Sequence, residues 1–191
     1  MKVLSVCGSL RAASLNAALL RTVARVSPAH IDVRACTGIG ELPFFNPDLA
    51  PDLPTSVIHL RAQVARADAL VIASPEYAHG MTGVIKNAMD WLVGFEPFRS
   101  KPVAIFNASP WSHLADASLK ETLRAMSVDL VKAACIDLPL IGEHITELDM
   151  VRLPTIVQPV QAALGALHRH VSPSTVFQLN IPSQPQQFST H

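Results

Sequence analysis

An excess of charge of either sign is missing from this sequence, since fifteen lysine and arginine residues balance fifteen aspartate and glutamate residues in a chain of 191 residues. Without a basic surplus there is no electrostatic reason to expect nucleic acid or an anionic membrane surface as a partner. The expected partner is therefore a small molecule. The length fits a single domain that buries a substantial core.

Long hydrophobic runs and closely spaced cysteines are missing as well. The apolar stretch at the N-terminus ends at Cys7 before a glycine turn, and it is too short for a signal peptide or a membrane span. The three cysteines, Cys7, Cys36 and Cys135, are isolated, which argues against a disulfide framework and a thiolate zinc site. The eight histidines form no recognisable metal-binding motif. We expect a cytoplasmic protein without a metal site.

The chain does contain a regular alternation of strand-length apolar runs and stretches with helical periodicity. The apolar runs occupy residues 2–7, 31–35, 69–73, 102–107 and 130–136. Continuously apolar strands are typical of a parallel sheet covered by helices on both faces, and right-handed crossovers then give a three-layer α/β sandwich. We expect this domain to span residues 1–171, followed by a polar, mobile tail at 172–191.

Two of the predicted helices carry clear signals. Ser14 is a suitable N-cap for the first helix, which is expected to end before Pro28. The third begins near Gly83 and has a wide apolar face that we expect to pack against another subunit. A proline-rich loop before the second helix carries Phe44 and Phe45, whose side chains need a partner surface.

A polar loop follows the first strand, at the sheet edge where open parallel sheets bind ligands. Gly8 permits a tight turn, after which backbone amides and the start of a helix face one small volume. Four side chains can donate hydrogen bonds to an anion there: Ser9, Arg11, Ser14 and Asn16. The loop therefore predicts a phosphate site. In the alternative interpretation, Ser14 is only a helix cap and Arg11 is only a surface charge.

Three other phosphate motifs do not fit this loop. A dinucleotide fingerprint needs glycine where Leu10 and Ala13 stand, and a nucleotide P-loop needs a lysine that is absent. A small phosphatase would use Cys7 as nucleophile and place an arginine at position 13. Because Arg11 comes too early for that role, we interpret Cys7 as a buried thiol at the end of a strand.

A second loop, residues 74–80, follows the third strand. Pro75 stiffens it, and its backbone groups can face the edge of a heteroaromatic ring. Tyr77, the only tyrosine of the chain, suits a platform for a flat ligand, or alternatively a partly buried loop aromatic. Glu76 is alternatively a catalytic carboxylate, although no second carboxylate accompanies it in the loop.

With both loops, the chain resembles the NADPH-dependent FMN reductase family of flavodoxin-like proteins over residues 1–170. The motifs are Gly-Ser-Leu-Arg-Ala-Ala-Ser-Leu-Asn at 8–16 and Pro-Glu-Tyr-Ala-His-Gly-Met-Thr-Gly at 75–83 with the helix after it. The resemblance implies a five-stranded parallel sheet of order 2-1-3-4-5, with the first loop around the FMN phosphate and the second along the isoalloxazine. The implied cofactor-binding residues are Ser9, Arg11, Ser14, Leu15, Asn16, Pro75, Glu76, Tyr77, Ala78, His79, Gly80, Ser109, Pro110 and Trp111.

The sequence departs from the family pattern at three places. Ala78 and Thr82 stand where the family commonly has asparagine and proline, and residues 107–113 replace a glycine-rich turn after the fourth strand. In that segment, Trp111 either stacks near the flavin or fills a hydrophobic gap.

The resemblance implies an enzyme that passes electrons from NADPH or NADH through FMN to a quinone, a free flavin or a similar acceptor, without a catalytic side chain. It also implies a homodimer or homotetramer. Two other hypotheses remain: an FMN-binding electron carrier or regulatory flavoprotein without nicotinamide activity, and a glycosyl-transferring enzyme with Glu76 as nucleophile.

Overall fold

The computed structural model describes residues 1–109, 111–138, 140 and 145–172. Its strands are β1 (Lys2–Cys7), β2 (Asp32–Ala35), β3 (Ala69–Ala73), β4 (Glu76–Tyr77), β5 (Gly80–Met81), β6 (Pro102–Asn107), β7 (Asp129–Leu130) and β8 (Ile136–Asp137). Its α-helices are α1 (Leu15–Val26), α2 (Thr55–Arg66), α3 (Gly83–Leu92), α4 (His113–Ala125), α5 (Glu147–Met150) and α6 (Pro154–Val171). Four short 3₁₀ helices are η1 (Ile39–Glu41), η2 (Pro47–Leu49), η3 (Glu96–Phe98) and η4 (Lys132–Ala134).

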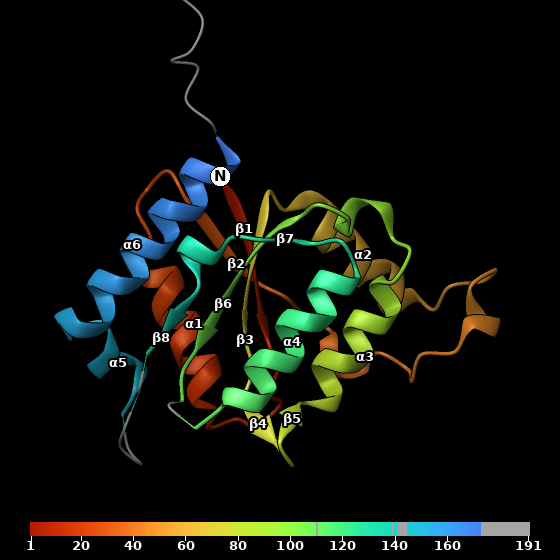
Figure 1. Ribbon diagram of the computed structural model, residues 1–191, viewed down its shortest axis with the longest axis horizontal. Helices are drawn as coiled ribbons and strands as arrows, with labels where there is room; N and C mark the ends of the chain where they lie inside the picture. Colours follow the sequence, from red (N-terminus) through yellow and green to blue (C-terminus); the bar gives the residue numbers. More distant parts are fainter. Residues whose placement is uncertain (110, 139, 141–144, 173–191) are drawn as a thin grey trace, which may run out of the picture.

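The main sheet is parallel and has the predicted order, β2-β1-β3-β6-β7, with β8 also paired to β6 (Figure 1). Crossover helices place α1, α5 and α6 on one face and α2, α3 and α4 on the other (Figure 1). The predicted flavodoxin-like sandwich is thus confirmed. None of the described helices combines the length and apolar character that crossing a bilayer requires.

Two hydrophobic cores lie on opposite faces of the sheet, because successive side chains of a strand point to opposite faces. On β3, Val71 belongs to the core beneath α1 and α6, whereas Leu70 and Ile72 belong to the core beneath α2, α3 and α4. All five residues of β3 are fully buried. This buried central strand therefore fixes the position of the loop that follows it at the carboxyl end of the sheet.

The predicted fifth strand, 130–136, is interrupted in the structure. β7 pairs with the start of β6 and β8 with its end, and η4 lies between them. Where the ladder is broken, the backbone N–H of Ile105 donates to Cys135 Sγ at 3.4 Å. The continuous strand was thus a wrong expectation, because a one-turn helix takes up the residues in its middle.

The apolar face of α3 is covered by its own chain. Ile85, Ala88, Met89, Trp91 and Leu92 are all buried within the chain. The expectation that this face contacts a second subunit is therefore wrong. The face packs on the sheet and against neighbouring loops. Its apolar surface is wide because the helix is covered on two sides.

The loop with the two phenylalanines finds its partner on the same helix. Trp91 Nε1 donates to the carbonyl oxygen of Pro43 at 2.8 Å, and Asn87 bonds the backbone of Pro43 and Phe45. The ring of Phe45 meets Trp91 edge-on at 5.1 Å between centroids. Phe44, by contrast, is 91% exposed. The predicted C-terminal tail lies outside the described residues, apart from Ser172.

The second predicted loop contains a β-hairpin that the sequence did not indicate. β4 and β5 are joined by Ala78 and His79, whose φ angles are +49° and +58°. Two consecutive positive φ angles are typical of a type I′ turn, which favours asparagine and glycine. The turn therefore carries strain at Ala78.

We expect Ala78→Gly to raise the free energy of unfolding by about 0.5–1 kcal/mol, because relief of left-handed strain exceeds the added entropy of the unfolded chain. Urea unfolding of the purified protein measures this. Ala50→Gly is the control, since Ala50 has φ −61°. It should lower stability by about 0.5–1 kcal/mol, and a loss in both variants would show that the turn is unstrained.

Candidate functional site

A cavity of about 1160 Å³ opens at the carboxyl ends of the central strands. Its walls come from the loop after β1, one side of α1 from Leu15 to Arg25, the loop after β3, the loop after β6 and the start of α5. Nine of the predicted site residues line it: Ser9, Arg11, Ser14, Leu15, Asn16, Pro75, Glu76, Tyr77 and Ser109. The fold thus brings together lining residues from Ser9 to Leu148, which are distant in the sequence.

Gly8 sets the distance between the first two walls. Its N–H donates to the carbonyl oxygen of Ala73 at 2.8 Å, which extends the β1–β3 pairing by one residue. A Cβ at position 8 would lie 2.3 Å from Ser74 Oγ and 2.8 Å from Ile85 Cγ1. Glycine is therefore required by close approach, with ordinary backbone angles.

The start of α1 presents hydrogen-bond donors to the cavity. Ser14 caps the helix as predicted, its hydroxyl oxygen accepting from the N–H of Ala17 at 3.2 Å. The N–H groups of Leu15 and Asn16 have no acceptor within the helix, as at any helix start. A hydroxyl has a proton as well as two acceptor positions, so Ser14 remains able to donate to a ligand. The cap role and the ligand role are compatible.

The other polar groups of this loop converge on the same volume. Ser9 Oγ accepts from the N–H of Arg11 at 3.4 Å, and its own proton is free for another acceptor. The side chain of Arg11 is exposed at the cavity wall. Asn16 is 7% exposed, and its Oδ1 is buried without a hydrogen-bond partner among the described residues. A buried acceptor of this kind is costly unless a ligand satisfies it.

Glu76 has a structural role in the second loop. Its Oε2 accepts from the N–H groups of Leu114 and Ala115, each at 2.9 Å, at the start of α4. These backbone donors, that of Ala115 foremost, lower the pKa of the carboxyl. Its side chain is 15% exposed. The carboxylate thus caps α4 and ties the hairpin to it, which is poor geometry for a nucleophile.

Tyr77 lies at the cavity wall, whereas the three loop residues after it lie outside the walls. Tyr77 is 51% exposed, so about half of its side chain is covered. It lines the cavity. Ala78 and His79 form the turn and Gly80 begins β5, and His79 Nδ1 lies 3.4 Å from Glu76 Oε1. These three do not line the cavity.

The loop after β6 is shaped by Asn107. Its side chain donates to Asp137 Oδ1 at 3.0 Å and accepts from the N–H of Ser109 at 3.1 Å, which holds Ser109 at the cavity. Trp111 is 81% exposed and does not line the cavity. The expectation that it fills a hydrophobic gap is therefore wrong for the single chain. Pro110 lies outside the described residues.

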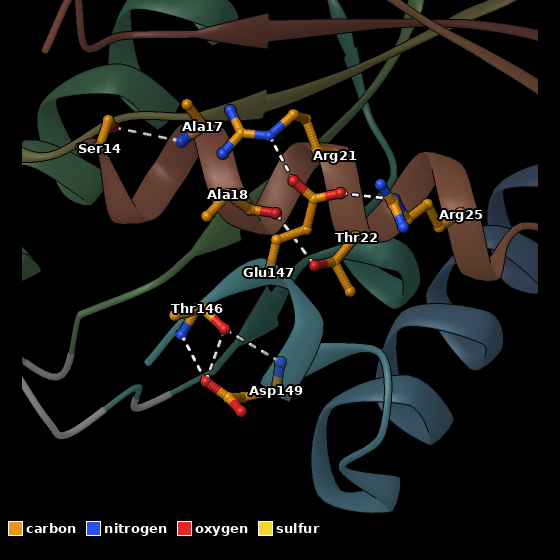
Figure 2. A network of polar contacts seen from close by, with 9 residues as sticks. All are labelled: Ser14, Ala17, Ala18, Arg21, Thr22, Arg25, Thr146, Glu147 and Asp149. Carbon is orange, nitrogen blue, oxygen red and sulfur yellow. Dashed lines mark hydrogen bonds and ion pairs between the residues drawn. The ribbon is translucent and has the colours of Figure 1, made fainter. Parts of the chain in front are cut away.

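A group of ionic residues on the cavity wall was missed from the sequence (Figure 2). Glu147, at the start of α5, pairs with both Arg21 and Arg25 of α1, with nitrogen–oxygen distances of 2.5 Å. Thr146 caps α5 and forms a capping box with Asp149. The spacing of the two arginines, one helical turn apart, was the available signal.

Cys7 is half-buried at the end of β1, and its thiol lies 3.5 Å from the carbonyl oxygen of Ser9, to which it can donate. It packs against the core beneath α1. Cys7, Cys36 and Cys135 are all free thiols. This placement agrees with the interpretation of Cys7 as a packing residue, with less burial than expected.

The sheet order and the position of this cavity define a flavodoxin-like α/β protein with a polar cavity at the carboxyl edge of its sheet. Residues 1–139 match the model of the NADPH-dependent FMN reductase family, and the chain belongs to that family. The resemblance carried by the two loop motifs is therefore confirmed.

Several curated relatives are similar over somewhat more than half of the chain. The quinone reductase of Escherichia coli (strain K12) is 35% identical over 113 residues, which cover 57% of this chain and 60% of that protein. The NAD(P)H-dependent FMN reductase PA1204 of Pseudomonas aeruginosa is 40% identical over 112 residues, with the same two shares. The 2-hydroxy-1,4-benzoquinone reductase of a Burkholderia species is 37% identical over 112 residues, covering 57% of this chain and 61% of that protein. The chain thus spans about 60% of the length of the curated relatives it matches.

Among solved structures, the flavoenzyme NAD(P)H:(acceptor) oxidoreductase FerB from Paracoccus denitrificans superposes with a TM-score of 0.77 at 27% identity. The match covers 88% of this chain and 98% of FerB. A flavodoxin from the domain Archaea superposes with a TM-score of 0.59 at 15% identity, over 88% of this chain and 98% of that one, which shows the shared fold.

The capping role of Glu76 predicts a pH dependence. Its folded pKa lies below the ordinary value of 4.5, so the stability it contributes is complete above about pH 4.5 and is lost as the pH falls through the folded pKa. Glu76→Gln should therefore unfold earlier in urea than the wild type at neutral pH, and the difference should shrink at acid pH. Glu41→Gln, in exposed η1, is the control. A difference that persists unchanged at pH 3 would contradict the capping role.

Proposed function

We propose that this chain is an FMN-dependent NAD(P)H oxidoreductase that passes electrons to a quinone, a free flavin or a similar small acceptor. The observation that carries the proposal is the set of polar groups around the start of α1, which includes a buried acceptor without a partner. We propose residues 1–171 as the FMN-binding domain and, since all three thiols are free, the cytoplasm as its compartment.

The residues present fit FMN in their hydrogen-bond chemistry. A phosphate needs donors, which Ser9, Arg11 and Ser14 supply together with the first amides of α1. Asn16 Oδ1 needs a donor, which a ribityl hydroxyl provides. The cavity thus offers donors and an acceptor in the proportions that a phosphorylated polyol requires.

The second loop suits the flat part of the cofactor. Pro75 and Glu76 line the cavity, and Glu76 fixes the hairpin on α4. Tyr77 lines the cavity from the loop after β3, and Ser109 lines it from the loop after β6. The proposed role of Ala78, His79 and Gly80 is backbone positioning of the hairpin. The proposed role of Trp111, which is 81% exposed, is contact with a ligand or a partner subunit.

The proposed electron transfer requires no side chain that acts as an acid or a base. When bound, FMN would supply the redox chemistry, a two-electron transfer from a nicotinamide to the acceptor. The protein binds the phosphate, orients the ring through the hairpin and keeps Glu76 ionised and engaged with α4. The substrates in the names of the E. coli and Burkholderia relatives support a quinone as acceptor.

The alternative of an FMN-binding carrier without nicotinamide activity is separated by spectroscopy. The purified protein should show a flavin spectrum that is bleached by NADPH or NADH without air. A flavin spectrum that neither donor bleaches would favour the carrier. A protein that binds no flavin at all would reject both functions.

We also propose that the protein assembles as a homodimer or homotetramer. Phe44 is 91% exposed although its loop is pinned to α3 by the Asn87 and Trp91 hydrogen bonds. Trp111, in the loop after β6, is 81% exposed. Large aromatic side chains held in fixed, exposed positions are typical of interfaces. The balanced charge of the chain gives no support to a nucleic-acid partner.

Arg11→Ala should weaken FMN binding about tenfold to a hundredfold, because a hydrogen bond to a charged group is worth roughly 1.5–3 kcal/mol. Riboflavin, which lacks the phosphate, should lose much less affinity. Flavin fluorescence titration measures both constants. Arg66→Ala, on the far end of α2, is the control and should bind both flavins as the wild type does. Equal losses for FMN and riboflavin in Arg11→Ala would place the phosphate elsewhere.

The assembly is tested by light scattering at micromolar concentration, where we expect the mass of a dimer or tetramer. Phe44→Ser should shift the mass towards the monomer, because it removes apolar area from the proposed interface. Ile58→Ser, an exposed apolar position on α2, is the control. A wild-type monomer with full FMN occupancy and activity would overturn the proposal.

A further inference from the structure

The cavity holds a second cationic centre besides Arg11. Arg21 and Arg25 line it from α1, one helical turn apart and therefore on the same side of the helix. They follow Ser14 by seven and eleven residues, which at 1.5 Å per residue places them roughly 10 and 16 Å along the helix from its cap. A phosphate bound at the helix start does not occupy them.

The size of the cavity leaves room for a second ligand beside the flavin. Its volume of about 1160 Å³ exceeds the range of roughly 300–1,000 Å³ usual for a single small molecule. FMN brings one phosphate, whereas the electron donor brings a pyrophosphate and, in NADPH, a further 2′-phosphate. A second anion subsite in the same cavity matches this difference in phosphate number.

Glu147 orients the two arginines without using up their donors. It binds Arg21 through Oε2 and Arg25 through Oε1, in each case at Nε (Figure 2). Each guanidinium has further N–H donors at its terminal nitrogens. Within the part of the chain that the structure describes, those terminal nitrogens donate no hydrogen bond. In Figure 2 those of Arg21 are directed towards the N-terminal end of α1, where Ser14 lies.

The charge of the group remains positive with Glu147 in place. Two guanidinium groups face one carboxylate, whose pKa is lowered first by the hydrogen bond from Arg21 and also by the charge of Arg25. The carboxylate is 17% exposed, whereas the arginine side chains are 53% and 59% exposed. The negative charge is thus turned inward and the positive charges outward.

We propose that Arg21 and Arg25, held in place by Glu147, bind a phosphate group of the nicotinamide dinucleotide. This inference rests on the proposed function, which supplies the electron donor. The arginines are binding residues for the donor, and Glu147 is a positioning residue. The terminal nitrogens of both arginines give up water for phosphate oxygens, and the ion pairs with Glu147 stay in place.

The competing explanation is that the three residues only fasten α5 to α1. The two explanations predict different effects of Glu147→Gln on the affinity for the electron donor. If the group is only a fastener, Arg25→Gln and Glu147→Gln break the same contact and should weaken donor binding alike. If the arginines bind phosphate, Glu147→Gln removes a negative charge beside the ligand and should strengthen binding or leave it unchanged.

The test is calorimetric titration of NADP⁺ and NAD⁺ into the protein, with and without saturating FMN. Arg21→Gln and Arg25→Gln should each raise the dissociation constant about fivefold to tenfold, as expected for one partly exposed charge pair. Glu147→Gln should lower it about twofold or not change it. Arg66→Gln is the matched control. Added salt should weaken wild-type binding more than that of the arginine variants.

A change for NADP⁺ alone would assign the subsite to the 2′-phosphate, and a change for both nucleotides would assign it to the pyrophosphate. Unchanged constants in the arginine variants, or a loss of affinity in Glu147→Gln equal to theirs, would overturn the inference. FMN titration of the same variants reports the proposed function separately, because neither arginine substitution should alter FMN affinity. Wild-type protein that binds NADP⁺ but no FMN would reject the proposed function and leave the subsite standing.

Discussion

The approach of β1 to the loop after β3 governs the geometry of the site. At Gly8 any side chain would collide with Ser74 and Ile85, and the Gly8 N–H bond to Ala73 holds the two segments together. The start of α1 takes its position from β1, and the hairpin takes its position from β3. The proposed phosphate-binding loop and the proposed ring-binding loop can therefore lie next to each other only because residue 8 has no side chain.

The two glutamates of the cavity illustrate how charge is used in this fold. Glu76 joins the hairpin to α4 through backbone amides, and Glu147 joins α5 to α1 through two arginines. Each carboxylate bridges segments distant in the sequence, and each has its pKa lowered by those partners. Both glutamates are ionised at neutral pH, and they hold the walls of the cavity in place relative to one another. A site whose redox chemistry belongs to a cofactor needs this kind of support more than it needs reactive side chains.

The sequence predicts those features that depend on local chemistry. The parallel strands, the Ser14 cap and the start of α3 follow from apolar runs and cap residues, whereas the strand order followed from the family resemblance. Nine of the predicted site residues do meet in one cavity. The hairpin escapes prediction because Ala78 and His79 are unusual residues for its turn. Glu147 escapes because it lies 126 positions from Arg21. The apolar face of α3 is misjudged because its pattern is the same whether its own chain or another covers it.

The interrupted fifth strand affects how the edge of the sheet can pair with another molecule. β7 and β8 are two residues each, with η4 between them, so that edge of the sheet presents no continuous row of backbone groups to another molecule. At the other edge, β2 has four residues and carries the exposed ion pair of Asp32 and Arg34. Short, broken or charged edge strands discourage pairing between molecules. Copies of this chain can therefore meet through helices and loops without the sheets fusing into a larger one.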